Sequence, residues 1–355
     1  MHGPRDHQEG LHDPMSAERD ASETARATAR RAFVRAAGFD PDRMEALPAD
    51  ASPRRYFRLH GGGSPRLLMD AAPAPDFHAF LRIARHLTGL GFSAPGIDSA
   101  DLERGFAVIE DFGNRTYTRL LAEGADERVL YELAVDTLAA IHRAEGSTRI
   151  DVPPYDDEPL FLELQMFTDW FAPQVAPGID VKAFRAAFFG LWDAALAEVK
   201  RSRDALVLRD FHVDNLMIVD GRAGVAACGL LDFQDALIGS AAYDLVSLTQ
   251  DARRDLMPGL EDALVERYLA ARPGLDRAAF MREYHLLAAH RHTKVAGNFE
   301  RLSKRDGKHG YLVHIPRVLR LLDKEMDAAG LTAIRAFIDR TLPGWADWRP
   351  TSPAA

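Results

Sequence analysis

The sequence is poor in cysteine and has no excess of basic charge, and each shortage excludes a class of protein. A single cysteine, Cys228, cannot form a disulfide within the chain, which is typical of a reducing compartment. Its place in an apolar segment favours a packed thiol over a reactive one. The 44 basic side chains are outnumbered by 53 acidic ones, giving a formal charge of −9. We therefore expect no nucleic-acid partner, because a polyanion needs a broad basic surface.

Long apolar runs are missing too, both as a membrane span and as the core of an N-terminal secretion signal. This favours a soluble cytoplasmic protein that acts on a small molecule and has no membrane partner. The 355 residues, 47% of them hydrophobic, can bury a sizeable core and suggest about two domains. We expect a disordered tail over 1–22 and a flexible tail over 346–355, because polar, Gly- and Pro-rich composition buries too little to offset ordering. The sequence carries no signal of oligomeric state.

The most informative segment is 205–233, where an Asp and an Asn five residues apart are followed by a second Asp. Phosphoryl transfer from ATP depends on positioning, on Mg²⁺ and on one carboxylate that receives the proton of the acceptor hydroxyl. We therefore predict Asp210 as the catalytic base and Asn215 and Asp232 as Mg²⁺ ligands, since this ion prefers hard oxygen donors. The alternative is that these residues only form turns, for which Asp and Asn are common.

Apolar runs around this motif predict its local structure. Residues 206–208 and 216–219 are expected to be short paired strands, with Asp210 and Asn215 on the loop between them. A further apolar run over 228–231 would deliver Asp232 from the end of a strand. Carboxylate and amide oxygens would then converge on one cation.

With the later Tyr243-Asp244-Leu245, the motif resembles the aminoglycoside phosphotransferase and choline kinase superfamily, over roughly 32–342. The resemblance implies an α+β, two-lobed protein-kinase-like fold, with a small antiparallel-sheet lobe and a larger, mainly helical lobe. We expect a nucleotide-binding lobe with its hinge over 23–113 and a catalytic and substrate lobe over 114–345. Tyr243 and Asp244 would be structural supports that brace the catalytic loop.

Four motifs narrow the resemblance to the N-acetylmuramate/N-acetylglucosamine anomeric kinases of bacterial cell-wall recycling. The implied activity is that of an ATP- and Mg²⁺-dependent phosphotransferase with an alcohol group as acceptor, here the C1 hydroxyl of the amino sugar. Two alternatives remain: a kinase of another small alcohol such as choline or an aminoglycoside, and a pseudokinase that only binds nucleotide. The motifs are Ser52–Arg58, Leu67–Ala71, Arg209–His212 and Arg291–Lys294 through Arg305–Lys308.

On the nucleotide side the sequence departs from protein kinases. The strand expected over 66–70 has Met69 about where those kinases carry a phosphate-binding Lys, and a Gly-rich phosphate loop is missing. Guanidinium groups match phosphate oxygens well, so an arginine is expected to supply the cation, unless these arginines form only a solvated edge. By resemblance, adenine would bind backbone groups near Glu110 and Phe112. The candidate arginines are Arg54, Arg55 and Arg58, of which Arg58 is the first choice.

On the acceptor side, a helix over 160–171 carries Glu163 and Trp170. Aromatic rings at helical spacing are usually core, but Trp170 could also face a sugar ring, and an acidic-aromatic pocket would suit a cationic acceptor. His212 is a further candidate for substrate contact. A lactyl carboxylate would need cations, which a helix near residue 290 offers, although such a face is often just solvated. These candidates are Arg291 and Lys294, with Asn298 and Arg301 one face along.

Overall fold

A computed structural model describes residues 14–48, 54–61 and 63–350, and the chain divides into two compact units. Unit 1 comprises the chain up to His78 together with Gly96–Asp111, and unit 2 comprises Ala79–Pro95 and the chain from Phe112 on. The tails expected over 1–22 and 346–355 lie outside the described residues for 1–13 and 351–355. Among the helices of the described part, none is long and apolar enough to cross a membrane.

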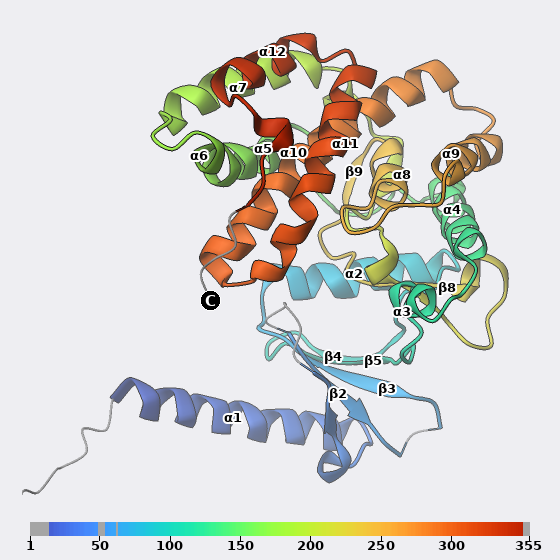
Figure 1. Cartoon of the computed structure of the whole chain (residues 1–355). Helices are drawn as coiled ribbons and strands as arrows, with labels where there is room; N and C mark the ends of the chain where they lie inside the picture. The colour runs from blue at the N-terminus through green and yellow to red at the C-terminus, as the bar shows by residue number, and fades with distance from the viewer. Residues whose placement is uncertain (1–13, 49–53, 62, 351–355) are drawn as a thin grey trace, which may run out of the picture. The chain divides into compact units, whose positions relative to one another are not determined.

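Unit 1 is built on a five-stranded antiparallel sheet (Figure 1). The sequence predicts two strands over 56–59 and 66–69 that follow each other across a glycine-rich turn, and the structure has paired strands over 55–59 and 66–70, with Leu59 opposite Arg66. The short first strand and β4 were not predicted, because neither has the alternating apolar pattern that marks a strand. The sheet order is β1 (Glu45–Ala46), β2 (Arg55–Leu59), β3 (Arg66–Asp70), β5 (Phe106–Glu110) and β4 (Ile97–Asp101).

Helix α1 (Pro14–Ala36) packs on one face of this sheet, and it begins inside the segment 1–22 that was expected to be a disordered tail. Val34 joins Leu68 and Val108 in a buried cluster, and the last two are directly opposite each other on β3 and β5. The carboxylate of Asp70, 2% exposed, accepts hydrogen bonds from Arg26 and Arg30 of the helix. The helix is therefore fixed to the sheet by apolar packing and by ion pairs. Helix α2 (Pro75–Gly89) follows the sheet strand β3.

Unit 2 is mainly helical and is organised around α10 (Arg277–Asp306), a helix of 30 residues that packs against α5, α8 and α11. The sequence predicts helices over 127–143, from regular apolar spacing, and over 260–271, and both are found with those bounds. With the sheet of unit 1, this confirms the predicted fold class. The other helices are α3 (Tyr117–Ala122), α4 (Glu127–Arg143), α5 (Asp157–Met166), α6 (Ala172–Val175), α7 (Val181–Ala195), α8 (Ala242–Thr249), α9 (Leu260–Ala271), α11 (Ile315–Ala328) and α12 (Thr332–Thr341).

A close approach of backbones fixes α10 against the segment that follows α5. A Cβ added at Gly297 would lie 2.1 Å from the carbonyl oxygen of Met166, so only glycine allows this packing. Directly after Met166 the chain forms a π-helical turn, η2 (Phe167–Phe171), in which the N–H of Ala172 bonds to the carbonyl of Phe167. Such turns are uncommon and often occur at functional sites.

The strands of unit 2 form two separate pairs, which corrects one expectation. Strand β6 (Ala205–Val207) pairs with β9 (Leu237–Gly239), and β7 (Leu216–Ile218) pairs with β8 (Cys228–Leu230). The runs at 206–208 and 216–219 are therefore strands, but they do not pair with each other. Apolar patterning reveals a strand without naming its partner, and β9 was not expected.

Candidate active site

The loop after β6 turns sharply at Arg209, which has a positive φ of 70°. This region is strained for a residue with a side chain, at roughly 1–3 kcal/mol, and it persists only where surrounding contacts impose it. Here the carboxylate of Asp244, fully buried in α8, accepts the backbone N–H groups of Leu208 at 2.6 Å and of Arg209 at 2.8 Å. Asp244 thus holds the strained turn that presents the next residue, Asp210.

The same turn is held from its carbonyl side. Arg291 of α10 and Ser247 of α8 donate hydrogen bonds to the carbonyl oxygen of Arg209, at 3.3 Å and 3.4 Å. Burial raises the pKa of Asp244 to about 7, even though the two N–H groups and Arg291 act to lower it. The positioning of Asp210 is therefore shared between two helices of unit 2.

The three residues of the predicted phosphoryl-transfer motif come together in unit 2. The side-chain amide of Asn215 donates to the carbonyl oxygen of Asp210 at 2.9 Å, which ties the ends of the loop together. The N–H of Leu231, the residue before Asp232, donates to the carbonyl of Asn215 at 2.9 Å. Asn215 precedes β7 and Asp232 follows β8, so the pairing of these two strands brings both side chains to one end of the ladder.

The donors present at this end suit a magnesium ion. The hydrogen bond to Asp210 uses the nitrogen of the Asn215 amide, so its oxygen is the group left to coordinate. Asp232 is exposed, has a positive φ of 55°, and accepts a hydrogen bond from Gln234 at 2.8 Å. Amide and carboxylate oxygens are the ligands that Mg²⁺ takes in proteins, with waters and substrate phosphates completing its shell. The residues therefore fit the ion that the motif implies.

Asp210 is held in its charged form. Burial acts to raise the pKa of this carboxyl, but the positive charges of Lys294 and Arg291, with His212 and Arg209, outweigh burial and lower it. A carboxylate in this state can accept a hydrogen bond from a hydroxyl group and receive its proton. The site contains an ionised base beside oxygen donors for a cation.

Glu163 lies at the centre of a buried ion-pair cluster that adjoins the loop carrying Asp210. Its carboxylate forms a short ion pair with Arg209 and accepts a hydrogen bond from Lys294 at 2.8 Å. Tyr155 donates to the same carboxylate at 2.6 Å. Burial alone would raise the pKa of Glu163, but Lys294 and Arg209 more than offset this and lower it strongly. The cluster joins α5, the catalytic loop and α10.

A cationic acceptor would need an acidic residue, and the two candidates in this region, Glu163 and Asp169, are already neutralised by ion pairs. Glu163 is 4% exposed and is paired with two cations. Asp169 in η2 pairs with Arg185 and accepts a hydrogen bond from Gln165 at 2.9 Å. Neither carboxylate is an uncompensated charge, so a positively charged acceptor gains little from them. Trp170, also in η2, is half-buried.

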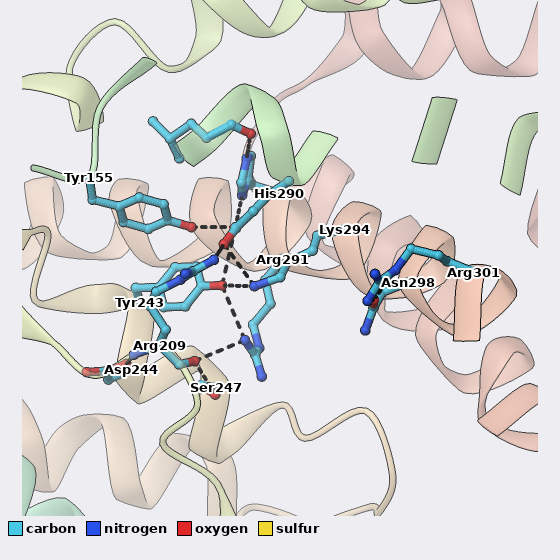
Figure 2. Close-up of polar contacts among 12 residues, drawn as sticks. Tyr155, Arg209, Tyr243, Asp244, Ser247, His290, Arg291, Lys294, Asn298 and Arg301 are labelled. Atoms are coloured by element: carbon cyan, nitrogen blue, oxygen red, sulfur yellow. Dashed lines mark hydrogen bonds and ion pairs between the residues drawn. The ribbon is translucent and has the colours of Figure 1, made fainter. Parts of the chain in front are cut away.

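Tyr243 and His212 lie next to this cluster. The hydroxyl of Tyr243 accepts hydrogen bonds from Arg291 and Lys294, both at 3.3 Å (Figure 2). His212 is 6% exposed, and its Nδ1 has no hydrogen-bond partner among the described residues. Burial lowers the pKa of His212, although Asp251 partly opposes this shift. Both residues therefore belong to the surroundings of Asp210.

The residues expected to contact nucleotide in unit 1 form internal ion pairs. Arg54 pairs with Asp76 at 3.2 Å, and Arg55 pairs with Glu23 at 2.7 Å. Arg58 pairs with Asp111 at 2.7 Å. Arg55 and Arg58 thus reach different carboxylates, in agreement with opposite faces of a strand. Met69, where a protein kinase has its lysine, is fully buried.

Two further expected residues lie where β5 ends, since Glu110 is the last residue of the strand and Phe112 follows two positions later. The carboxylate of Glu110 accepts the backbone N–H of Gly96 at 3.3 Å within unit 1. In unit 2, the guanidinium of Arg222 lies 5.4 Å from the ring centre of Phe112.

Several residues of the cluster were missed by sequence reasoning. Tyr155 precedes α5 and His290 is fully buried in α10, with its Nε2 at 3.0 Å from the carbonyl of Leu160. Ser247 lies one turn after Tyr243. None of them has a distinctive spacing to Asp210. Only the unusual density of polar residues on an otherwise buried helix could have drawn attention to the stretch around 290.

The fold and this site define a protein-kinase-like phosphotransferase that acts on an alcohol group. Residues 43–281 match the model of the family described as "Phosphotransferase enzyme family". The chain is 38% identical over 369 residues to an N-acetylmuramate/N-acetylglucosamine kinase of Caulobacter vibrioides, covering 93% of this chain and 98% of that one. It is 35% identical over 292 residues to a Pseudomonas aeruginosa protein of the same name, with coverages of 79% and 83%. The chain therefore belongs to the phosphotransferase enzyme family.

Solved structures show the same fold at low sequence identity. A choline/ethanolamine kinase family protein from Mesorhizobium loti superposes with a TM-score of 0.55 at 15% identity, covering 82% of this chain and 92% of that one. The aminoglycoside phosphotransferase APH(2'')-Ib, solved with ADP bound, gives a TM-score of 0.53 at 15% identity, with coverages of 84% and 97%.

Proposed function

We propose that the protein transfers a phosphoryl group from ATP to the anomeric C1 hydroxyl of N-acetylmuramate or N-acetylglucosamine, giving the sugar 1-phosphate and ADP. The observation that carries the proposal is the ionised carboxylate of Asp210, presented by a strained turn beside Asn215 and Asp232. The choice of sugar is supported by relatives of this name that match most of the chain.

In this reaction Asp210 would accept a hydrogen bond from the C1 hydroxyl and receive its proton as the oxygen attacks the γ-phosphorus. An anomeric hydroxyl is more acidic than an ordinary alcohol, so a carboxylate whose pKa is lowered remains a sufficient base. Asn215 and Asp232 would hold Mg²⁺, which supplies charge compensation on phosphate oxygens when bound.

For the nucleotide we propose that an arginine of unit 1 takes the place of the missing strand lysine. Arg58 remains the first choice, with Arg54 and Arg55 as the other candidates. Because each is paired with a carboxylate, the phosphate contact would require it to share or exchange that partner. Backbone groups near Glu110 and Phe112 are proposed to bind adenine, which leaves those side chains free to keep their own contacts.

For the acceptor we propose two kinds of residue. His212 and Trp170 would contact the sugar, because both lie beside elements that carry the catalytic cluster. Glu163 would not contact the sugar itself but would hold Arg209 and Lys294 in place through its ion pairs. Arg291 and Lys294 would keep the region around Asp210 positive and are candidates for contact with oxygen atoms of the acceptor.

A cationic acceptor such as choline or an aminoglycoside has less support, because Glu163 and Asp169 are already neutralised. A nucleotide-binding pseudokinase has less support as well, since Asp210, Asn215 and Asp232 are all present and brought together. We also propose a role in the recycling of peptidoglycan sugars, in the cytoplasm, where ATP and recovered amino sugars are both available.

The test is release of ADP, coupled to NADH oxidation, with ATP, Mg²⁺ and a panel of acceptors: both amino sugars, choline and an aminoglycoside. We expect turnover with the amino sugars, and a fall in kcat of about 10²–10⁴-fold in Asp210→Asn with little change in the sugar KM. The matched control is Asp220→Asn, an exposed carboxylate ten residues on that pairs with Arg115.

Phosphorus NMR of the product distinguishes a 1-phosphate from phosphorylation at another hydroxyl. Turnover with choline but neither sugar, or undiminished turnover in Asp210→Asn, would refute the proposal.

A further inference from the structure

Four polar residues of α10 form a single stripe that leads away from the catalytic loop. Arg291, Lys294, Asn298 and Arg301 are separated by three, four and three positions, the spacing of one face of a helix (Figure 2). The stripe lies in unit 2, and α10 also packs there against η2, the turn that carries Trp170. A ligand extending from Asp210 along α10 would meet these residues in order.

Arg291 and Lys294, at the end of the stripe nearest Asp210, already form contacts within the protein. Arg291 donates to the carbonyl of Arg209 and to the hydroxyl of Tyr243, and its guanidinium lies 5.5 Å from the centre of that ring. Lys294 is paired with the buried carboxylate of Glu163 at 2.8 Å. Their charges maintain the loop and the ionised Asp210, so neither is a spare cation for an acidic substituent.

The far end differs, because Arg301 forms no ion pair with a carboxylate of the described residues, although the charge of Asp306 acts to raise its pKa. Its Nε and one Nη donate to the same oxygen of Asn298, at 3.1 Å and 2.8 Å, and no carboxylate of the described residues lies within 4.0 Å of the guanidinium. The side chain is only partly exposed, and both burial and the neighbouring cation Arg305 lower its pKa. The second Nη has no partner among the described residues, so one edge of the guanidinium is left for an anion.

Asn298 holds the guanidinium of Arg301 in place through two hydrogen bonds. Its oxygen receives both bonds from Arg301, so its NH₂ group remains as a further donor. A carboxylate is the anion whose geometry matches a guanidinium edge, and a neighbouring amide N–H can complete its coordination. A sulfate or phosphate would also bind a cation, but a planar two-oxygen group makes best use of this pair.

The contacts of Arg301 place its guanidinium beyond Arg291 along the helix. The bonds to Asn298 place the guanidinium of Arg301 near the level of residue 298, seven positions beyond Arg291, or about 10 Å along the axis. Arg291 in turn contacts the residue before Asp210. An acceptor held at Asp210 that also reaches Arg301 would therefore extend along α10 past Arg291 and Lys294.

We propose that Arg301, positioned by Asn298, binds the lactyl carboxylate of N-acetylmuramate and is the residue that favours this sugar over N-acetylglucosamine. The inference rests on the proposed function, since it concerns the acceptor of the same site. Arg301 makes no contact with the catalytic loop, so it contributes to binding of one substrate and leaves the chemistry unchanged.

The test compares Arg301→Gln with the wild type in initial-rate measurements on both sugars. We expect the KM for N-acetylmuramate to rise about tenfold or more, the size of a lost charge-assisted contact. The kcat/KM for N-acetylglucosamine should change by less than about twofold, because that sugar has no carboxylate. Arg301→Lys keeps the charge but not the two-donor edge and should recover part of the loss. The control is Arg277→Gln, an exposed cation at the start of the same helix that pairs with Glu266.

A modified substrate makes the test independent of folding. N-acetylmuramate with its carboxyl group converted to an amide should be a poor substrate for the wild type, and Arg301→Gln should not distinguish it from the acid. Equal losses on both sugars in Arg301→Gln, or no loss on either, would overturn the assignment while leaving the kinase activity in place. If the wild type phosphorylates neither sugar, the proposed function itself fails, and this inference falls with it.

Discussion

At the scale of single residues, the site depends on compensated strain and compensated charge. Arg209 adopts a positive φ because Asp244 binds its N–H and Arg291 binds its carbonyl, while Glu163 neutralises its side chain. The residue that precedes the base is therefore held at three points. Glu163 also pairs with Lys294, one of the cations that keeps Asp210 ionised. A substitution of Glu163 should therefore affect Asp210 indirectly, through Arg209 and Lys294.

We predict that Glu163→Gln destabilises the protein by about 3–5 kcal/mol, because two cations lose their buried counter-charge. The measurement is the free energy of unfolding in urea, followed by circular dichroism. Asp157→Asn is the control: this carboxylate also belongs to α5, but it is 71% exposed where it pairs with Lys200. That surface pair should contribute no more than about 1 kcal/mol. Equal losses in the free energy of unfolding would show that the buried ion pairs of Glu163 contribute no more than a surface pair.

At the scale of elements, α10 connects the parts of unit 2 that carry the site. It supplies Arg291 and Lys294 to the catalytic loop, and Arg301 to the proposed acceptor end. Its distance from α5 and η2 is set at Gly297, where the backbone of Met166 comes into direct contact. The ion pair between Lys294 and Glu163 lies one turn away from this contact point.

We predict that Gly297→Ala destabilises the protein by about 1–3 kcal/mol, because the new methyl group meets backbone atoms that cannot move aside. Since the shift would disturb Lys294 and Glu163, kcat should fall together with stability. Gly190→Ala is the matched control, because Gly190 lies within α7 with nothing within 4 Å of the added Cβ. That change should instead stabilise by up to about 1 kcal/mol. Thermal and urea unfolding of both variants would test this, and a neutral Gly297→Ala would contradict it.

Elements with a local signal could be predicted from the sequence, and contacts between distant residues could not. Apolar spacing gave the bounds of α4 and α9, and the Asp-Asn-Asp motif identified residues that the fold brings together. The pairing of β6 with β9 was missed, because three apolar residues do not specify a partner strand. The bond between Glu163 and Lys294 joins positions 131 residues apart, for which local patterning carries no information.

At the scale of the whole molecule, stability should depend on pH through buried groups other than Asp210. Burial lowers the pKa of His142 and of His292 to about 3. Both folded values lie below the value of about 6.5 for an exposed histidine, so the unfolded chain binds protons that the folded chain does not. This stability is present above pH 6.5 and is lost as the pH falls toward 3. Asp244 acts in the opposite direction, because its folded pKa of about 7 exceeds the ordinary value.

Near pH 5 each of the two histidines should therefore lower the free energy of unfolding by about 1.4 kcal/mol for each unit that the pH falls. Asp244 should raise it by about 1.4 kcal/mol per unit, which offsets the effect of one histidine. We predict that the free energy of unfolding in urea falls on acidification from pH 6 to pH 4. In His292→Gln the slope of this fall should be smaller by about 1.4 kcal/mol per pH unit, the effect of one bound proton. His292 bonds to Gln250 at 2.8 Å inside unit 2, and a neutral glutamine can keep that contact without titrating. Exposed His78→Gln should leave the slope unchanged. An unaltered slope in His292→Gln would mean that this histidine does not control acid unfolding, and that charged groups elsewhere in the chain do.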